Sequence, residues 1–273
     1  MSEYITLDNG ETVFFDDYRD ASASSPGAGQ ALVALHGLGG GGYFFAGIGR
    51  ELASRGGRVL CPDMPGSGFS RRGDREVSFE RFADVVVQLI ERKAVGRVTL
   101  LGHSMGTIVA LKVLDRIPDR IRSMVFVGGL PAPLPEAQAR LRDRAGLARS
   151  AGMGAVAPTV VPVVFAQRSL DAIPDKVGMF QRLLACSDAE GYAQTALALA
   201  GASAEEVVGR VRIPCLCVTG AEDRYAPPGA VRAFAEMIPG AVYREMGGCG
   251  HMPFFEDPEG FVGVVQKFLS RGG

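Results

Sequence analysis

Residues 98–106 read Val-Thr-Leu-Leu-Gly-His-Ser-Met-Gly, and this stretch decides how the rest of the chain is organised. Its first four residues are apolar or β-branched, which is typical of a buried strand. A Gly-x-Ser-x-Gly pattern follows at once, and residues 107–114 continue as an apolar segment of helical length. A strand–turn–helix connection this tight needs glycine on both sides, and it raises the Ser104 hydroxyl above the end of the sheet in a strained conformation. The stretch therefore predicts a nucleophilic serine at the carboxyl end of a buried strand.

The rest of the chain alternates short apolar runs with helix-length segments. We expect strands at residues 5–7, 12–15, 31–35, 58–61, 98–101, 121–127, 213–219 and 242–246. The first two flank Asn9-Gly10, which is a strong hairpin signal. Residues 21–30 are small and polar and are expected to form a loop. Strands that alternate with helices form a sheet covered on both faces, so the sequence predicts the α/β class, with an eight-stranded, mostly parallel sheet flanked by helices.

The alternation stops between about residues 131 and 210, where the pattern is helical and no run resembles a strand. Pro131, Pro133 and Pro135 open this region, and Pro214 closes it. We therefore expect a helical cap at residues 131–210, inserted into an α/β core made of residues 1–130 and 211–273.

Composition argues against several classes of function. The 273 residues carry a net charge of −1, which gives no electrostatic basis for binding nucleic acid or an anionic membrane. The N-terminus lacks the pattern of a signal peptide, and no apolar run has the length of a membrane span. Five cysteines without a framework spacing indicate free thiols and a cytoplasmic location. No motif requires a metal ion or an organic cofactor. We expect a small molecule as the partner, and a chain that is a monomer or a homodimer.

The expected serine needs a base within hydrogen-bonding reach, and the chain has three histidines. His36 lies in a glycine-rich loop, which we expect it to anchor, and His103 points away from the serine beside it. His251 lies in a flexible loop after the last strand and is therefore the expected base. Asp223 follows the next-to-last strand and is expected to orient the imidazole, with Glu222 as the alternative.

An acyl-transfer site also needs two N–H donors for the oxyanion. Met105 N–H follows the serine directly, and we select Leu38 N–H by its position in the glycine-rich loop after the strand at 31–35. In the cap, we expect Val164, Phe165 and Met179 to line an apolar substrate pocket. A substrate that carries a carboxylate would require a cationic anchor, for which the candidates are Arg140, Arg144, Arg168 and Arg182.

The chain resembles the α/β-hydrolase superfamily in five segments: HGLG at 36–39, DMPGSGFS at 63–70, GHSMG at 102–106, GAED at 220–223 and GH at 250–251. Within the superfamily it most resembles 3-oxoadipate enol-lactonases and related carboxylesterases, in SDAEGY at 187–192, GAED at 220–223 and Pro227-Pro228. The chain order Ser104, Asp223, His251 is also that of this fold.

This resemblance implies hydrolysis of a carboxylic ester or lactone through an acyl-enzyme. One alternative is a carbon–carbon bond hydrolase of the meta-cleavage-product type, although those enzymes usually carry Asn before the nucleophile and this chain carries His103. The alternative from another class is a non-catalytic small-molecule receptor on the same fold.

Overall fold

The structure, a computed structural model, describes residues 1–19, 31–93 and 96–271. The loop expected at residues 21–30 lies outside the described residues. The described strands are β1 (Ser2–Thr6), β2 (Thr12–Arg19), β3 (Ala31–Leu35), β4 (Arg58–Pro62), β5 (Val98–His103), β6 (Ile121–Val127), β7 (Cys215–Gly220) and β8 (Val242–Met246). They form one sheet in the order β1-β2-β4-β3-β5-β6-β7-β8, in which β2 pairs antiparallel with β1 and β4 and the other neighbours are parallel. The predicted eight-stranded, mostly parallel sheet is confirmed.

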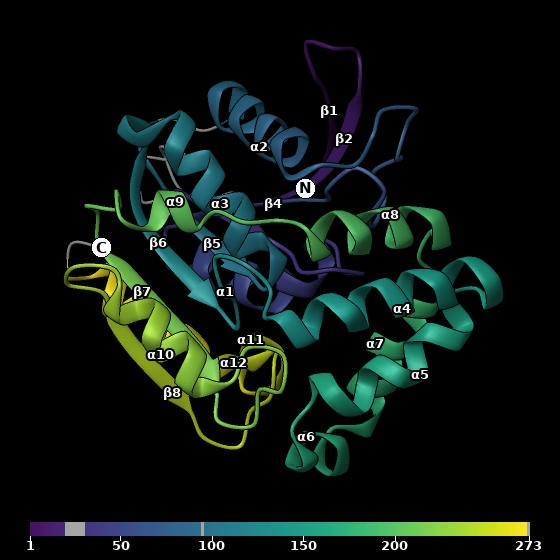
Figure 1. The fold of residues 1–273 in the computed structure, drawn as a ribbon. Helices are drawn as coiled ribbons and strands as arrows, with labels where there is room; N and C mark the ends of the chain where they lie inside the picture. Colours follow the sequence, from purple (N-terminus) through teal and green to yellow (C-terminus); the bar gives the residue numbers. More distant parts are fainter. Residues whose placement is uncertain (20–30, 94–95, 272–273) are drawn as a thin grey trace.

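Helices cover the central strands. Every residue of β3, β4, β5 and β7 is buried, as expected of strands with both faces covered. The helix α2 (Phe79–Lys93) packs on α3 (Met105–Arg116), and α1 (Ala46–Ser54) packs on α12 (Pro258–Leu269). The Ser78 hydroxyl caps α2 by accepting the Arg81 N–H at 3.2 Å. Figure 1 shows how these helices and α10 (Pro228–Glu236) flank the sheet.

The N-terminal hairpin turns where the sequence predicts. Leu7 N–H donates to Glu11 O at 2.7 Å, and Gly10 has a φ of +83°, which suits glycine. The second strand, β2, extends to Arg19 rather than ending at Phe15, because its residues Phe15–Arg19 pair with β4. The hairpin pattern does not reveal that second partner.

Residues 131–210 are all described, and each regular element among them is a helix. These are α4 (Pro135–Ala151), α5 (Met153–Val164), α6 (Gln167–Ala172), α7 (Pro174–Ala185), α8 (Ala189–Ala200) and α9 (Glu205–Val208). The helix α4 packs on α5 and α8, and α5 packs on α7. Figure 1 shows α4 to α8 grouped at one end of the sheet, whereas α9 returns to the core beside α3. We call α4 to α8 the inserted helices.

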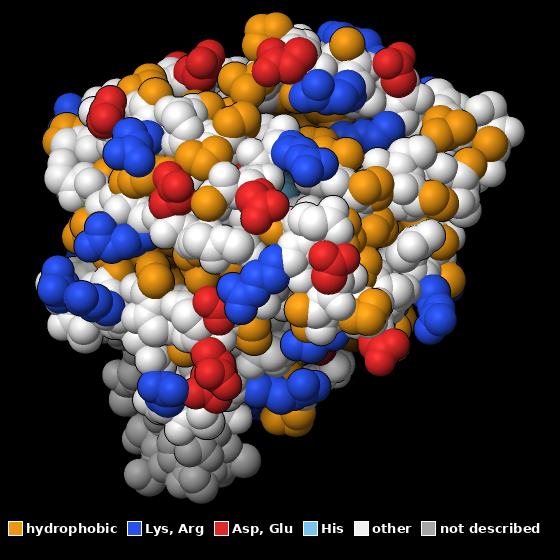
Figure 2. All heavy atoms as spheres, turned by 90° about the horizontal axis from the view of Figure 1, so that it is seen from below, with side chains coloured by type: hydrophobic (Ala, Val, Ile, Leu, Met, Phe, Trp, Pro, Cys, Tyr) orange, Lys and Arg blue, Asp and Glu red, His pale blue; other side chains and the backbone are white. Residues whose placement is uncertain are grey.

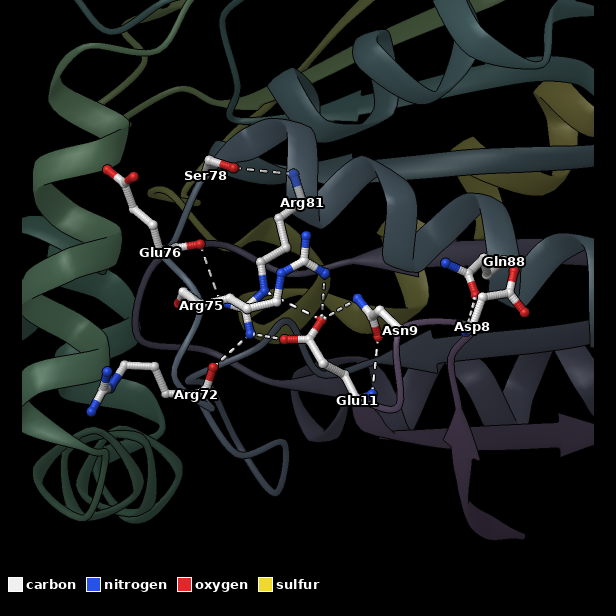
Figure 3. Close-up of polar contacts among 9 residues, drawn as sticks. All are labelled: Asp8, Asn9, Glu11, Arg72, Arg75, Glu76, Ser78, Arg81 and Gln88. Atoms are coloured by element: carbon white, nitrogen blue, oxygen red, sulfur yellow. Dashed lines mark hydrogen bonds and ion pairs between the residues drawn. The ribbon is translucent and has the colours of Figure 1, made fainter.

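A buried arginine fixes the loop at residues 71–77 (Figure 3). Arg81 is only 5% exposed, and its guanidinium forms an ion pair with the Glu11 carboxylate of the hairpin. The same group donates to the backbone carbonyls of Arg72 at 2.6 Å, Arg75 at 2.7 Å and Glu76 at 3.2 Å. One side chain from α2 therefore ties this loop to the first hairpin.

The surface carries charges of both signs. On the face shown in Figure 2, Lys and Arg side chains alternate with Asp and Glu side chains, with hydrophobic groups between them. Among the described residues, no helix combines the length and the apolarity that crossing a bilayer would take.

Candidate active site

Ser104 lies on a strained turn between β5 and α3. It has φ +53° and ψ −118°, and it is the one non-glycine residue with positive φ among the described residues. The neighbouring glycines are required because the backbones nearly touch. A Cβ on Gly102 would lie 2.5 Å from Gly106 O, and a Cβ on Gly106 would lie 2.3 Å from Leu35 O. The turn therefore has the geometry expected from the sequence.

The structure brings His251 and Asp223 into direct contact. His251 Nδ1 lies 3.0 Å from Asp223 Oδ1 and 2.9 Å from Oδ2, and both side chains are buried. The carboxylate is itself held, because Oδ1 also accepts the backbone N–H groups of Tyr225 and Ala226, each at 2.9 Å. An ionised carboxylate can only accept, so we assign the proton to Nδ1, which leaves the Nε2 lone pair free to act as a base.

Glu222, the alternative to Asp223, contacts a different part of the chain. Its side chain is exposed, and its carboxylate accepts the Gln167 N–H at 3.3 Å from the start of α6. The geometry therefore favours Asp223 as the carboxylate that orients the imidazole.

Ser104 and His251 line a common cavity of about 110 Å³ between the sheet and the inserted helices. Within the described part of the chain, the serine hydroxyl has no hydrogen-bond partner. In ligand-free sites, the hydrogen bond between a nucleophile and its base is often long and tightens only when substrate binds. Leu38 and Met105 line the same cavity, and among the described residues their backbone N–H groups donate to no acceptor. Both groups are thus available to bind an oxyanion.

The other two histidines are held neutral. Burial lowers the pKa of His36 to about 4, and its Nε2 accepts the Met64 N–H at 3.0 Å while Nδ1 faces Gly37 O at 2.8 Å. This is the anchoring role expected for His36. Burial also places the pKa of His103 well below its ordinary value, and His103 Nε2 lies 3.0 Å from His251 O, to which it donates.

The expected substrate-binding residues are only partly in place. Val164 lines the cavity, whereas Phe165 is buried behind it against Phe180, with ring centroids 5.0 Å apart. Met179 is 53% exposed and does not line the cavity, so that prediction was wrong. The reason is helical phase: on α7 the positions that line the cavity are Phe180 and Leu184, which are four residues apart, and Met179 does not share this spacing.

Among the described residues, one cationic group lies in the roof of the cavity. Arg140, Arg168 and Arg182 are exposed, whereas Arg144 of α4 lines the cavity. Its Nη1 donates to the Tyr225 hydroxyl at 2.9 Å, and its guanidinium carbon lies 5.1 Å from the centre of that ring.

Arg144 is also incompletely satisfied. Its Nε is buried without a hydrogen-bond partner, and within the described residues the side chain forms no ion pair. Tyr192 lies against the same cavity, and burial raises the pKa of both Tyr192 and Tyr225, so their hydroxyls stay protonated. The remaining wall is mainly apolar, with Leu141, Val160, Phe180, Leu184 and Leu199. This arrangement suits a small apolar molecule with one anionic group.

Comparison with known proteins identifies the family of this chain. The family model described as "alpha/beta hydrolase fold" matches residues 30–258. A pimeloyl-[acyl-carrier protein] methyl ester esterase from Chromobacterium violaceum is 30% identical, over 89% of this chain and 95% of that protein. A 2-hydroxy-6-oxononadienedioate/2-hydroxy-6-oxononatrienedioate hydrolase from Cupriavidus pinatubonensis is 26% identical, over 99% of this chain and 96% of that protein. The crystal structure of the enol-lactonase from Burkholderia xenovorans LB400 superposes with a TM-score of 0.89 at 25% identity, over 98% of this chain and 100% of that chain. The chain therefore belongs to the α/β-hydrolase fold family.

Proposed function

We propose that the protein is a serine hydrolase that cleaves a carboxylic ester or lactone of a small molecule. The observation that carries this proposal is the buried His251–Asp223 pair, which opens onto the same cavity as the strained Ser104. A strained serine, an oriented imidazole and two free N–H groups are the parts that acyl transfer requires.

The reaction proceeds through an acyl-enzyme. His251 Nε2 takes the Ser104 proton as the hydroxyl oxygen attacks the substrate carbonyl, and Asp223 stabilises the imidazolium that forms. The N–H groups of Leu38 and Met105 bind the oxyanion, and each is worth about 3 kcal/mol to the transition state. The imidazolium then returns its proton to the leaving alkoxide, which departs as the alcohol, or stays attached when a lactone ring opens. A water molecule activated by His251 releases the acid and restores the serine.

The substrate that we propose carries a carboxylate. Arg144 is a cation in the wall of a mainly apolar cavity, and within the described residues no carboxylate pairs with it, so a substrate carboxylate would supply the missing counter-ion. The Tyr225 hydroxyl accepts from Arg144 and can donate its own proton to the same anion. The names of the enol-lactonase and of the pimeloyl-[acyl-carrier protein] methyl ester esterase, both similar to this chain, describe a lactone and an ester, which supports the proposed class of reaction.

We further propose that residues 131–210 act as a cap on a core made of residues 1–130 and 211–273. The inserted helices supply much of the cavity wall, including Leu141, Val160 and Phe180, which supports a role in substrate selection. The cysteines among the described residues are free thiols, which fits the reducing cytoplasm.

The decisive experiment removes the nucleophile. Ser104→Ala should lower the turnover of a 4-nitrophenyl ester by several orders of magnitude while the circular dichroism spectrum and the melting temperature stay close to those of the wild type. A fluorophosphonate probe should label the wild type at Ser104 and leave the variant unlabelled. A wild-type protein that hydrolyses no ester and takes up no probe would instead support the small-molecule receptor.

The second candidate is hydrolysis of a carbon–carbon bond, which the similarity to the Cupriavidus pinatubonensis hydrolase supports. A panel that pairs 4-nitrophenyl esters and an acidic lactone with a 2-hydroxy-6-oxo-dienoate separates the two reactions. Turnover of the dienoate at a higher kcat/KM than any ester or lactone would replace the ester proposal.

A further inference from the structure

One carboxylate other than Asp223 accepts hydrogen bonds from an unusual set of donors. Glu256, at the end of α11 (Pro253–Glu256), accepts the N–H groups of Gly250 at 2.8 Å and Met252 at 3.3 Å through Oε1. Its Oε2 accepts the Ala166 N–H at 2.9 Å and the Ser169 hydroxyl at 2.7 Å. Within the described residues it forms no ion pair, so these four neutral donors stabilise the carboxylate.

Two of those donors lie on either side of the expected base. His251 belongs to a loop without regular secondary structure between β8 and α11, so its position depends on individual hydrogen bonds. Gly250 N–H and Met252 N–H are bound by Glu256, and the His251 N–H donates to Val164 O at 2.7 Å. The loop is thereby held at three consecutive N–H groups.

The other two donors belong to the inserted segment. Ala166 and Ser169 lie just after Val164, where α5 ends and α6 begins. The loop and this segment are in close contact, since a Cβ on Gly250 would lie 2.5 Å from Val164 O and 2.7 Å from Ala166 N. Glu256 therefore fastens the base loop and the inserted segment to each other through a single side chain.

We propose that Glu256 is a positioning residue that sets the imidazole of His251 for proton transfer and couples its loop to the inserted helices. The inference rests on the proposed function, because it assigns His251 as the base. Val164 both lines the substrate cavity and accepts the His251 N–H, so contacts made by substrate on this wall reach the base loop directly. Loss of the carboxylate should loosen this link without removing any group that touches the substrate.

The test is Glu256→Gln, which keeps the size of the side chain but places an amide NH₂ against N–H or O–H donors. We expect kcat for a 4-nitrophenyl ester to fall roughly 10- to 100-fold with KM within about twofold of wild type, since a small displacement of a catalytic group costs that much. The rate of fluorophosphonate labelling should fall by the same factor, and the amides of Gly250, Met252 and Ala166 should exchange with deuterium faster. Glu259→Gln is the matched control, because Glu259 is exposed and lies three residues further on.

Glu256→Ala is measured in the same way. The melting temperatures of both Glu256 variants are also measured, so that a loss of activity caused by unfolding is recognised. Wild-type labelling and kcat in Glu256→Gln would overturn the proposal, as would an equal loss in Glu259→Gln or a loss explained by the unfolded fraction. A wild-type protein that takes up no probe would refute the serine hydrolase instead, and the exchange of the three amides would still report on the Glu256 contacts.

Discussion

The replacement of Asp223 by asparagine tests the orientation of the base. The carboxylate is bound asymmetrically: Oδ1 accepts the N–H groups of Tyr225 and Ala226 as well as His251 Nδ1, whereas Oδ2 accepts from Nδ1 alone. An asparagine at this position must keep its carbonyl oxygen toward the two N–H groups. Its NH₂ group then faces His251 Nδ1 as a donor, which moves the imidazole proton to Nε2 and removes the lone pair that the serine needs.

The magnitude follows from those contacts. To restore the active tautomer, the asparagine must turn its NH₂ toward the two buried N–H groups, and leaving each without an acceptor costs about 2 kcal/mol. Loss of the carboxylate charge adds about 1 kcal/mol, because a charge-assisted hydrogen bond to the imidazolium becomes a neutral one. The sum of about 5 kcal/mol corresponds to a rate that is lower by roughly 10³- to 10⁴-fold.

The assay is kcat/KM for a 4-nitrophenyl ester in Asp223→Asn, with Glu222→Gln as the control. Glu222 precedes Asp223 but is exposed and hydrogen-bonds to Gln167 N–H, so its substitution should change the rate less than about threefold. A rate for Asp223→Asn within tenfold of wild type, in a folded protein, would show that Asp223 does not orient the base.

Three further outcomes are expected. Arg144→Met should lower kcat/KM for a 4-nitrophenyl monoester of a dicarboxylic acid by about 10- to 100-fold more than for its neutral methyl-capped analogue. Arg142→Met, at an exposed position, should leave the ratio of kcat/KM between the two esters unchanged. An equal loss on both esters would mean that Arg144 only supports the fold. His36 has a folded pKa of about 4 against about 6.5 when unfolded, so the unfolded state binds more protons between these values. The stability that His36 contributes is therefore present above pH 6.5 and lost toward pH 4, and the difference in unfolding free energy between wild type and His36→Gln should shrink by about 3 kcal/mol over that range in urea titrations. Arg81→Met should cost about 3–5 kcal/mol by urea unfolding, because it leaves Glu11 without its buried partner, whereas Arg75→Met should cost less than about 1 kcal/mol.

The parts of the site that sequence reasoning found are those dictated by the backbone. The turn at Ser104 allows only glycine at positions 102 and 106, so the Gly-x-Ser-x-Gly motif identifies the turn in the sequence. Asp223 and His251 follow β7 and β8, and strand order places the ends of these strands near the end of β5. A residue that must follow a particular strand is visible in a sequence once the strands are identified.

The parts that sequence reasoning missed depend on packing between distant elements. The sequence does not distinguish the four arginines that are candidate anchors. Only the packing of α4 places Arg144 against Tyr225. Met179 and its neighbour Phe180 are both large and apolar, and only the seating of α7 decides which one is inward. Glu256 looks like an ordinary charged residue at a helix end, because its four donors come from backbone groups and one serine that no pattern connects.

The residues that we expect to carry out the reaction and those that we expect to select the substrate lie in different parts of the molecule. Ser104, Asp223 and His251 follow strands of one sheet, which cannot shift singly without breaking the ladder between neighbours. Much of the cavity wall that would face the rest of a substrate is supplied by the inserted helices, which pack mainly on each other. Substitutions at the strand ends should therefore abolish the turnover of every ester alike, whereas substitutions on the inserted helices should change the ranking among esters. Glu256 joins the two parts, so its variants are the exception that should lower every rate through the base loop while leaving the ranking unchanged.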